Sequence, residues 1–332
     1  MNKRIMITAV LLVCALLFSF GCKPIVVPPI TIDYGNFEKR FDEVGFEVMD
    51  IEDSIAKGSD KMAAFVHLME VAETNWDSAD YLAKFTDGSG EAYTGKIGGK
   101  MTGRSLYLRN PSSFYYIFGS MLTESNPKEG LPAAQAMLNQ CRREYSSDMK
   151  TFYQQEPKNN GKPTISDEFP FFSCDYTKAK VESFNAEEWK IKRENKDKIG
   201  EFTSFVFDEQ TVLADSISIE YKEEYGYYTL YFELNLEDKE ARDRATEFPR
   251  KILRDIAQSN DIEYRVYNLT MEIWDNGLIR SIETEESWEG SIKVWILPTL
   301  HGSSSSSTKD YYSWDPKDCE YASYGLDIDW IP

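Results

Sequence analysis

Side chains that commonly carry catalysis are scarce in this sequence and are not grouped. It contains 2 histidines, and His67 has no histidine partner at helical spacing. A glycine-rich phosphate loop, a G-x-S-x-G turn and an H-E-x-x-H zinc sequence are all missing from it. The 56 Asp and Glu residues could supply a carboxylate pair for glycoside hydrolysis, but the required separation of roughly 5–10 Å is not visible in a sequence. We therefore predict a protein that is not an enzyme and has no cofactor and no metal site, with a carboxylate-based glycan hydrolase as an alternative.

Cys22 directly follows a segment with the features of an export signal. Basic residues at positions 3 and 4 precede an apolar run over 5–20, which is shorter than the roughly 20 residues that a membrane-spanning helix needs. The run ends in Ser19-Phe20-Gly21-Cys22, with a small residue directly before the cysteine. This ending resembles the lipobox of bacterial lipoprotein precursors, except that Ser19 stands where the box prefers leucine, valine or alanine. The resemblance implies a signal peptide over residues 1–21 and a diacylglycerol thioether on Cys22, with a plain secretory signal or an uncleaved anchor as alternatives.

A lipid on Cys22 would decide where the protein lies. The body would stand outside the cytoplasm, in the bacterial cell envelope, anchored to a membrane by acyl chains of which each buried CH₂ contributes about 0.8 kcal/mol. Residues 22–35 are rich in proline and would form the tether. The formal net charge of −19 gains nothing from anionic headgroups and provides no basic face for nucleic acid. We expect membrane lipid as a partner through Cys22, an apolar or lipid ligand as a further candidate partner, and no nucleic acid.

The remaining cysteines belong to the exported body, where disulfides are permitted. Residues 131–145 predict a helix with Cys141 on its apolar face, where a buried free thiol is the usual occupant. This leaves Cys174 and Cys319 as the candidate disulfide, although sequence alone does not fix connectivity. Aromatic and acidic side chains crowd the C-terminal tail over 311–330. We interpret them as packing on the sheet rather than as a sugar platform or a calcium site, because the tail has no calcium-binding loop with its glycine and terminal glutamate.

The elements that must position these residues are clearest between residues 202 and 297. A strand over 202–207 precedes alternating apolar residues over 216–222 and 228–236, which predict an antiparallel hairpin. A helix should follow from Asp238. The alternation then changes parity within 262–275, which predicts a β-bulge before a tight turn at Asp275-Asn276-Gly277.

The first half of the body predicts helices followed by short strands. Apolar spacings of three and four residues favour helices over 36–57 and 60–73. Changes of period and Gly-rich or Pro-containing turns favour strands over 81–86, 91–97, 105–108 and 113–119. Near the end of the chain, the serines of 303–307 predict a flexible loop.

The order of these elements predicts an α+β fold: a curved antiparallel β-sheet, open like half a barrel, with helices packed on one face. We expect one large domain over residues 36–332, with 154–163 as the boundary if it divides. The later half resembles the open-barrel envelope lipoproteins that carry lipids or other lipoproteins, through its topology and its bent strand. The resemblance favours a membrane-anchored envelope lipoprotein that binds an apolar ligand or an envelope component. A structural or adhesive surface lipoprotein without a cavity is the alternative.

Overall fold

The structure is a computed structural model. It describes residues 40–41, 60–94, 97–125, 140–148, 151–156, 164–165, 172–173, 176–182, 205–251, 261–292, 300–324, 326 and 328–332. The predicted signal peptide over 1–21, the tether over 22–35 and most of the predicted helix over 36–57 lie outside these residues.

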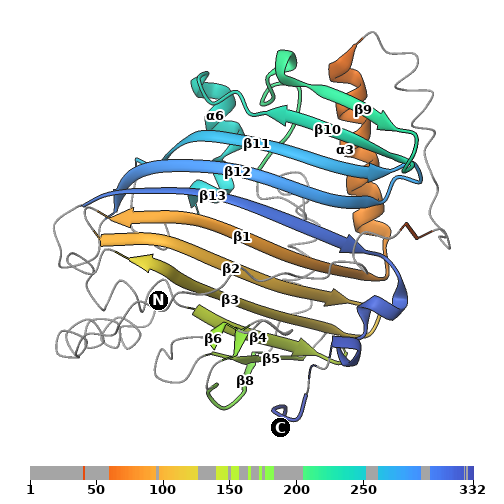
Figure 1. The fold of residues 1–332 in the computed structure, drawn as a ribbon, viewed down its shortest axis with the longest axis vertical. Helices are drawn as coiled ribbons and strands as arrows, with labels where there is room; N and C mark the ends of the chain where they lie inside the picture. Colours follow the sequence, from red (N-terminus) through yellow and green to blue (C-terminus); the bar gives the residue numbers. More distant parts are fainter. Residues whose placement is uncertain are drawn as a thin grey trace.

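A single open sheet of 11 strands dominates the fold, in the order β8-β5-β4-β3-β2-β1-β13-β12-β11-β10-β9 (Figure 1). Each pair of neighbouring strands is antiparallel. One half of the sheet comprises β1 (Leu82–Thr94), β2 (Ile97–Arg109), β3 (Phe114–Ser125), β4 (Gln140–Ser146), β5 (Phe152–Gln155) and β8 (Lys180–Glu182). The other half comprises β9 (Ser218–Lys222), β10 (Tyr227–Glu233), β11 (Glu263–Trp274), β12 (Ile279–Ile292) and β13 (Leu300–Ser313). The predicted antiparallel sheet is therefore confirmed, while a cover of helices on one face stays a prediction.

The remaining described elements are short, apart from one helix. They are the helices α3 (Lys61–Ser78) and α6 (Lys239–Ala245), the 3-10 helices η3 (Ala214–Ser216), η4 (Pro316–Cys319) and η5 (Tyr321–Tyr324), and a separate pair of strands, β6 (Thr164–Ile165) and β7 (Phe172–Ser173). Among the residues that the structure describes, no helix is long and apolar enough to cross a membrane.

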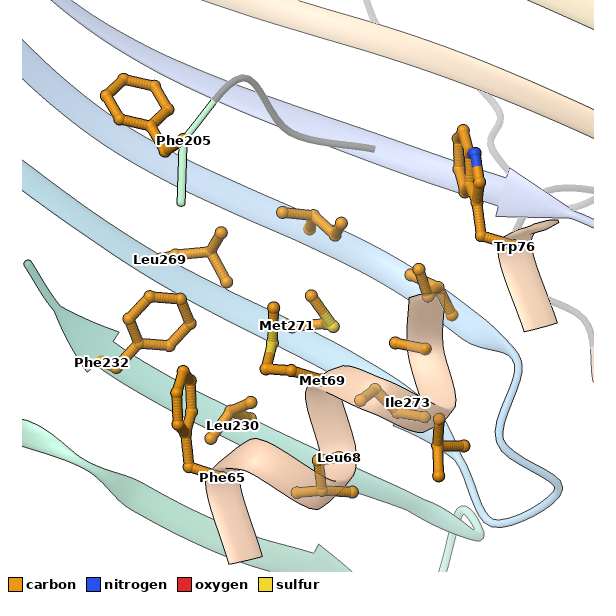
Figure 2. Packing of buried hydrophobic residues seen from close by; sticks show 14 of the residues in the cluster. Phe65, Leu68, Met69, Trp76, Phe205, Leu230, Phe232, Leu269, Met271 and Ile273 are labelled. Carbon is orange, nitrogen blue, oxygen red and sulfur yellow. The ribbon is translucent and has the colours of Figure 1, made fainter. Parts of the chain in front are cut away.

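Helix α3 begins where the sequence predicts and continues beyond the predicted end at residue 73. The Asp60 side chain caps it by accepting hydrogen bonds from the backbone N–H groups of Met62 and Ala63 at 3.0 and 3.4 Å. Its apolar side chains at spacings of three and four residues point onto β10 and β11 (Figure 2). The ring of Phe65 meets that of Phe232 edge to face, with 4.9 Å between centroids. Packing of this face stabilises the helix more than residue propensity does.

The β11–β12 hairpin confirms two predictions from parity and turn residues. The pairing register shifts between Tyr264 and Val266, which is the predicted bulge, and Val266 accordingly lies exposed. Gly277 closes the turn with φ of 83°, a conformation that suits glycine. Asn75 of α3 donates a side-chain hydrogen bond of 2.8 Å to the Gly277 carbonyl, which ties the end of α3 to the hairpin.

The serine run is not a loop. Residues 303–307 lie in the middle of β13, where Ser305 pairs with Glu91 of β1 and Ser287 of β12. Backbone hydrogen bonds on both sides hold this strand, so side-chain polarity does not decide its structure. Gly90 of β1 lies against the same run, and a Cβ atom added there would stand 2.4 Å from the Ser305 carbonyl oxygen. The Gly-rich turn expected between the predicted strands over 81–86 and 91–97 is likewise wrong, because β1 continues through residues 87–90.

Two further elements differ from the prediction. Residues 140–145 of the predicted helix over 131–145 belong to β4, and residues 131–139 lie outside the described residues. Cys141 and Tyr145 are four apart, a spacing that fits one face of a helix and one face of a strand alike, and pairing with β3 selects the strand. Residues 205–207 of the predicted strand over 202–207 are also not a strand, and 202–204 lie outside the described residues. Phe205 packs on Tyr267 with 4.0 Å between ring centroids.

The two halves of the sheet bury opposite faces. On the helix face, defined as the face on which α3 packs, one row of paired residues changes from apolar to polar as it crosses from β11 to β2: Met271, Ile282, Asp310, Thr86 and Ser105. On the tail face, defined as the opposite face, the adjacent row changes from polar to apolar: Glu272, Ser281, Tyr311, Phe85 and Leu106. The C-terminal residues pack on this second apolar half, among them Cys319, Tyr321, Tyr324, Leu326 and Trp330. The predicted packing of the aromatic tail on the sheet is therefore confirmed.

Candidate functional site

The helix face beyond α3 carries half-buried aromatic side chains next to charged ones. We call the helix face of β12, β13 and β1–β3 the mixed surface. Lys84, Tyr107, Tyr116 and Asp310 lie toward one end of these strands, and Glu286 and Trp288 lie toward the other. Strand alternation brings them to one side, and the pairing of β1 with β13 brings the two halves of the sequence together. Ligand sites typically combine apolar rings with a few placed polar groups, so the mixed surface is the candidate site.

Asp310 forms the centre of a hydrogen-bonded group on this surface. Its carboxylate accepts hydrogen bonds from Thr86 Oγ1 at 2.6 Å and from the Tyr312 hydroxyl at 3.3 Å. Lys84 Nζ lies 3.5 Å from Asp310 Oδ2 as an ion pair. Burial, and then the Asp310 carboxylate, raise the pKa of Tyr312 well above its usual range. The charge of Asp310 is thus compensated within the group, which positions the β1–β13 junction.

Tyr116 marks the β3 side of the mixed surface. The Arg142 guanidinium lies 5.7 Å from its ring centroid, and Arg142 Nε lies 3.1 Å from Glu144 Oε1. Burial raises the pKa of Tyr116, although Arg142 and a hydrogen bond with Ser105 oppose the shift. The phenol therefore stays neutral, so Tyr116 offers an aromatic ring and a hydroxyl to whatever contacts it.

Glu286 lies on the β12 side of the same surface. Its cross-strand neighbours are Tyr267 of β11 and Ser306 of β13, and Ser306 Oγ donates a hydrogen bond of 3.3 Å to Glu286 Oε1. Burial raises the pKa of Glu286, and the bond from Ser306 opposes the shift only in part. Burial and the nearby Glu286 carboxylate raise the pKa of Tyr264. Glu286 is therefore a desolvated acid among aromatic side chains.

The residues singled out from the sequence are not brought together. Cys22 and Cys174 lie outside the described residues. Cys319 is buried, its Sγ lies 3.4 Å from the Asp315 carbonyl oxygen, and burial raises its pKa. The disulfide between Cys174 and Cys319 stays a prediction. Cys141 is buried on β4, with its sulfur 2.9 Å from the Tyr176 hydroxyl.

Among the described residues we find no candidate metal site and no histidine placed in a site. No group of three or more His, Cys, Asp or Glu residues suited to a metal ion occurs there. His67 is half-buried in α3, and its Nε2 atom has no hydrogen-bond partner among the described residues.

Sequence reasoning missed Glu286 and Asp310. One signal was present, because strand alternation places Glu286 on the same face as Ile282 and Trp288. A carboxylate between apolar residues of one face is unusual and marks a position to inspect. Asp310 gave no such signal, since Thr86, which donates to it, is 224 residues away in the chain.

No protein-family model matches the chain, and no curated protein matches it.

Proposed function

We propose that the protein is a non-enzymatic lipoprotein of the bacterial cell envelope that binds an apolar ligand or another envelope component on the mixed surface. Its anchor would be a lipid on Cys22, and its sheet would curve as an open half-barrel with helices on the helix face. The observation that carries the binding role is the pair of half-buried rings of Tyr107 and Tyr116, which are cross-strand neighbours on the helix face. The lipobox resemblance at Cys22 supports the anchor.

The energetics favour the mixed surface over the rest of the helix face. Beneath α3 the face is filled by the protein itself, since Leu230, Phe232 and Met271 are fully buried there. The rings of the mixed surface keep part of their area accessible. Covering that area with an acyl chain would contribute roughly 25 cal/mol per Å² of apolar surface removed from water.

A structural or adhesive lipoprotein is the second candidate. The continuous packing between α3 and β9–β13 favours it, because a solid core needs no ligand to complete it. The two candidates differ in one measurable respect, which is whether the purified protein binds a lipid.

Native mass spectrometry of the full chain with Cys22→Ser tests the proposal, since this variant lacks its own anchor. We expect a lipid-bound species after gentle purification and binding of a fluorescent fatty-acid analogue or a neutral lipid at micromolar concentration. Tyr107→Ala should weaken this binding, because Tyr107 lies on the mixed surface. Tyr231→Ala, the same change at a half-buried tyrosine on the tail face, serves as the matched control. A bare protein mass with no lipid bound at micromolar concentration would favour the structural candidate.

A further inference from the structure

Glu286 differs from the other carboxylates of β12 in its surroundings. On the tail face, Glu283 lies 3.9 Å from Lys309 Nζ and Glu289 lies 2.6 Å from Arg265 Nη2. Glu286 lies on the helix face and is half-buried. Within the described ranges it forms no ion pair, and its hydrogen-bond partner there is Ser306.

Aromatic side chains of β11 and β12 flank this carboxylate on the same face, and serines of β13 lie on its other side. Tyr267 stands directly across from it in β11, and Trp288 follows it at the next position of β12 that shares the face. Tyr264 is the cross-strand partner of Trp288 and is close enough to feel the Glu286 charge. Tyr264 and Tyr267 are buried, whereas Trp288 and Glu286 are half-buried. A ligand can therefore approach from the side of Trp288.

An uncompensated carboxylate in such surroundings is costly, because burial removes its water without supplying a counter-charge. A cation would offset that cost. An organic ammonium group suits the place better than a metal ion, since the half-buried Trp288 ring can attract an ammonium group, whereas Ca²⁺ and Mg²⁺ require several oxygen ligands. A fatty-acid carboxylate would instead meet like-charge repulsion from Glu286.

We propose that Glu286, with the half-buried Trp288 beside it, binds the ammonium group of an amine-bearing amphiphile whose chain lies on the mixed surface. The inference rests on the proposed function and adds the charge of the ligand's polar group. On the described helix face, Lys84 and Arg142 could attract an anionic group instead, but each is paired, with Asp310 and Glu144 respectively. Arg109 is buried there and donates hydrogen bonds to the carbonyls at the end of α3.

The test compares dodecyltrimethylammonium, dodecanoate and tetramethylammonium, each below micellar concentration, on the full chain with Cys22→Ser. Titration calorimetry and tryptophan fluorescence give the dissociation constants. We expect the alkylammonium to bind at least about tenfold more tightly than dodecanoate of the same chain length. Glu286→Gln should weaken alkylammonium binding about tenfold and remove the preference. Glu285→Gln, at the exposed neighbour on the tail face, should leave both constants unchanged.

Each result separates this inference from the proposed function. If dodecyltrimethylammonium and dodecanoate bind equally tightly, or if Glu286→Gln leaves the dodecyltrimethylammonium affinity unchanged, the cation site is overturned and apolar binding is left intact. If neither dodecyltrimethylammonium nor dodecanoate binds to any variant, both proposals are overturned. Tetramethylammonium binding as tightly as the long-chain probe would assign the site to free amines and overturn the amphiphile. The comparison of dodecyltrimethylammonium with dodecanoate can be made without changing Glu286. It therefore stays decisive if Glu286→Gln folds poorly.

Discussion

Phe65→Ala should show how far α3 depends on its contact with the sheet. The Phe65 side chain is fully buried and meets Phe232 edge to face at 4.9 Å, so its removal takes away both apolar burial and a ring contact. Truncation of a buried phenylalanine costs about 3–5 kcal/mol of unfolding free energy. With a urea m-value of about 2–3 kcal/mol per M, the midpoint should fall by roughly 1–2 M while m stays constant. Urea unfolding followed by tryptophan fluorescence and circular dichroism measures both quantities.

A double-mutant cycle isolates the ring contact from the cavity. Phe65→Ala combined with Phe232→Ala should cost less than the sum of the single changes, with a coupling of about 0.5–1.5 kcal/mol. Tyr225→Ala is the control, because Tyr225 is 59% exposed and its truncation should change stability by less than about 0.5 kcal/mol. A loss below about 1 kcal/mol in Phe65→Ala, with m unchanged, would refute the view that α3 completes the core of the helix face.

Three other perturbations test the anchor, the strand contact and the buried acid. Cys22→Ser should abolish incorporation of labelled palmitate in cells, and a variant that still labels contradicts the lipobox reading. Gly90→Ala should destabilise the protein by about 1–3 kcal/mol in urea unfolding, because the added Cβ would stand 2.4 Å from the Ser305 carbonyl oxygen. Burial raises the pKa of Glu286 in the folded state, so its contribution to stability is full below the unfolded pKa and is lost as pH rises through the folded pKa. Glu286→Gln should therefore gain stability relative to wild type as the pH rises above the unfolded pKa of about 4.3, and parallel curves would contradict the assignment.

Local patterns predicted the elements whose structure depends on near neighbours. Tyr228, Leu230 and Phe232 alternate in β10, and one face of that strand is buried as predicted. The parity switch in β11 marked the bulge, because a bulge is the way in which one strand turns a second set of side chains to the core. Asp60 and the apolar spacing after it marked α3, since capping and amphipathicity act within a few residues.

Elements whose structure depends on distant partners were predicted poorly. The serines of 303–307 form a strand because β1 and β12 pair with them on both sides, and neither partner is recognisable from the serine run itself. The Cys141 segment fits a helix and a strand equally well until β3 is placed beside it. The candidate site depends on such pairings throughout. Glu286 faces Ser306 and Asp310 faces Thr86 only because of the registers of β13, which no local pattern specifies.

The exchange of buried faces between the halves of the sheet explains why the mixed surface lies where it does. The α3 core covers the helix face of β9–β12, and the C-terminal residues cover the tail face of β1–β4. The end of α3 reaches β13 where Trp76 packs on Tyr312, but in the row of Ile282 the helix face becomes polar at Asp310. An apolar sheet face must be covered by something, so the half-buried rings at this boundary are a direct result of the exchange. A ligand with an apolar chain and a cationic group would match the boundary, since its chain could cover the rings and its charge could compensate Glu286.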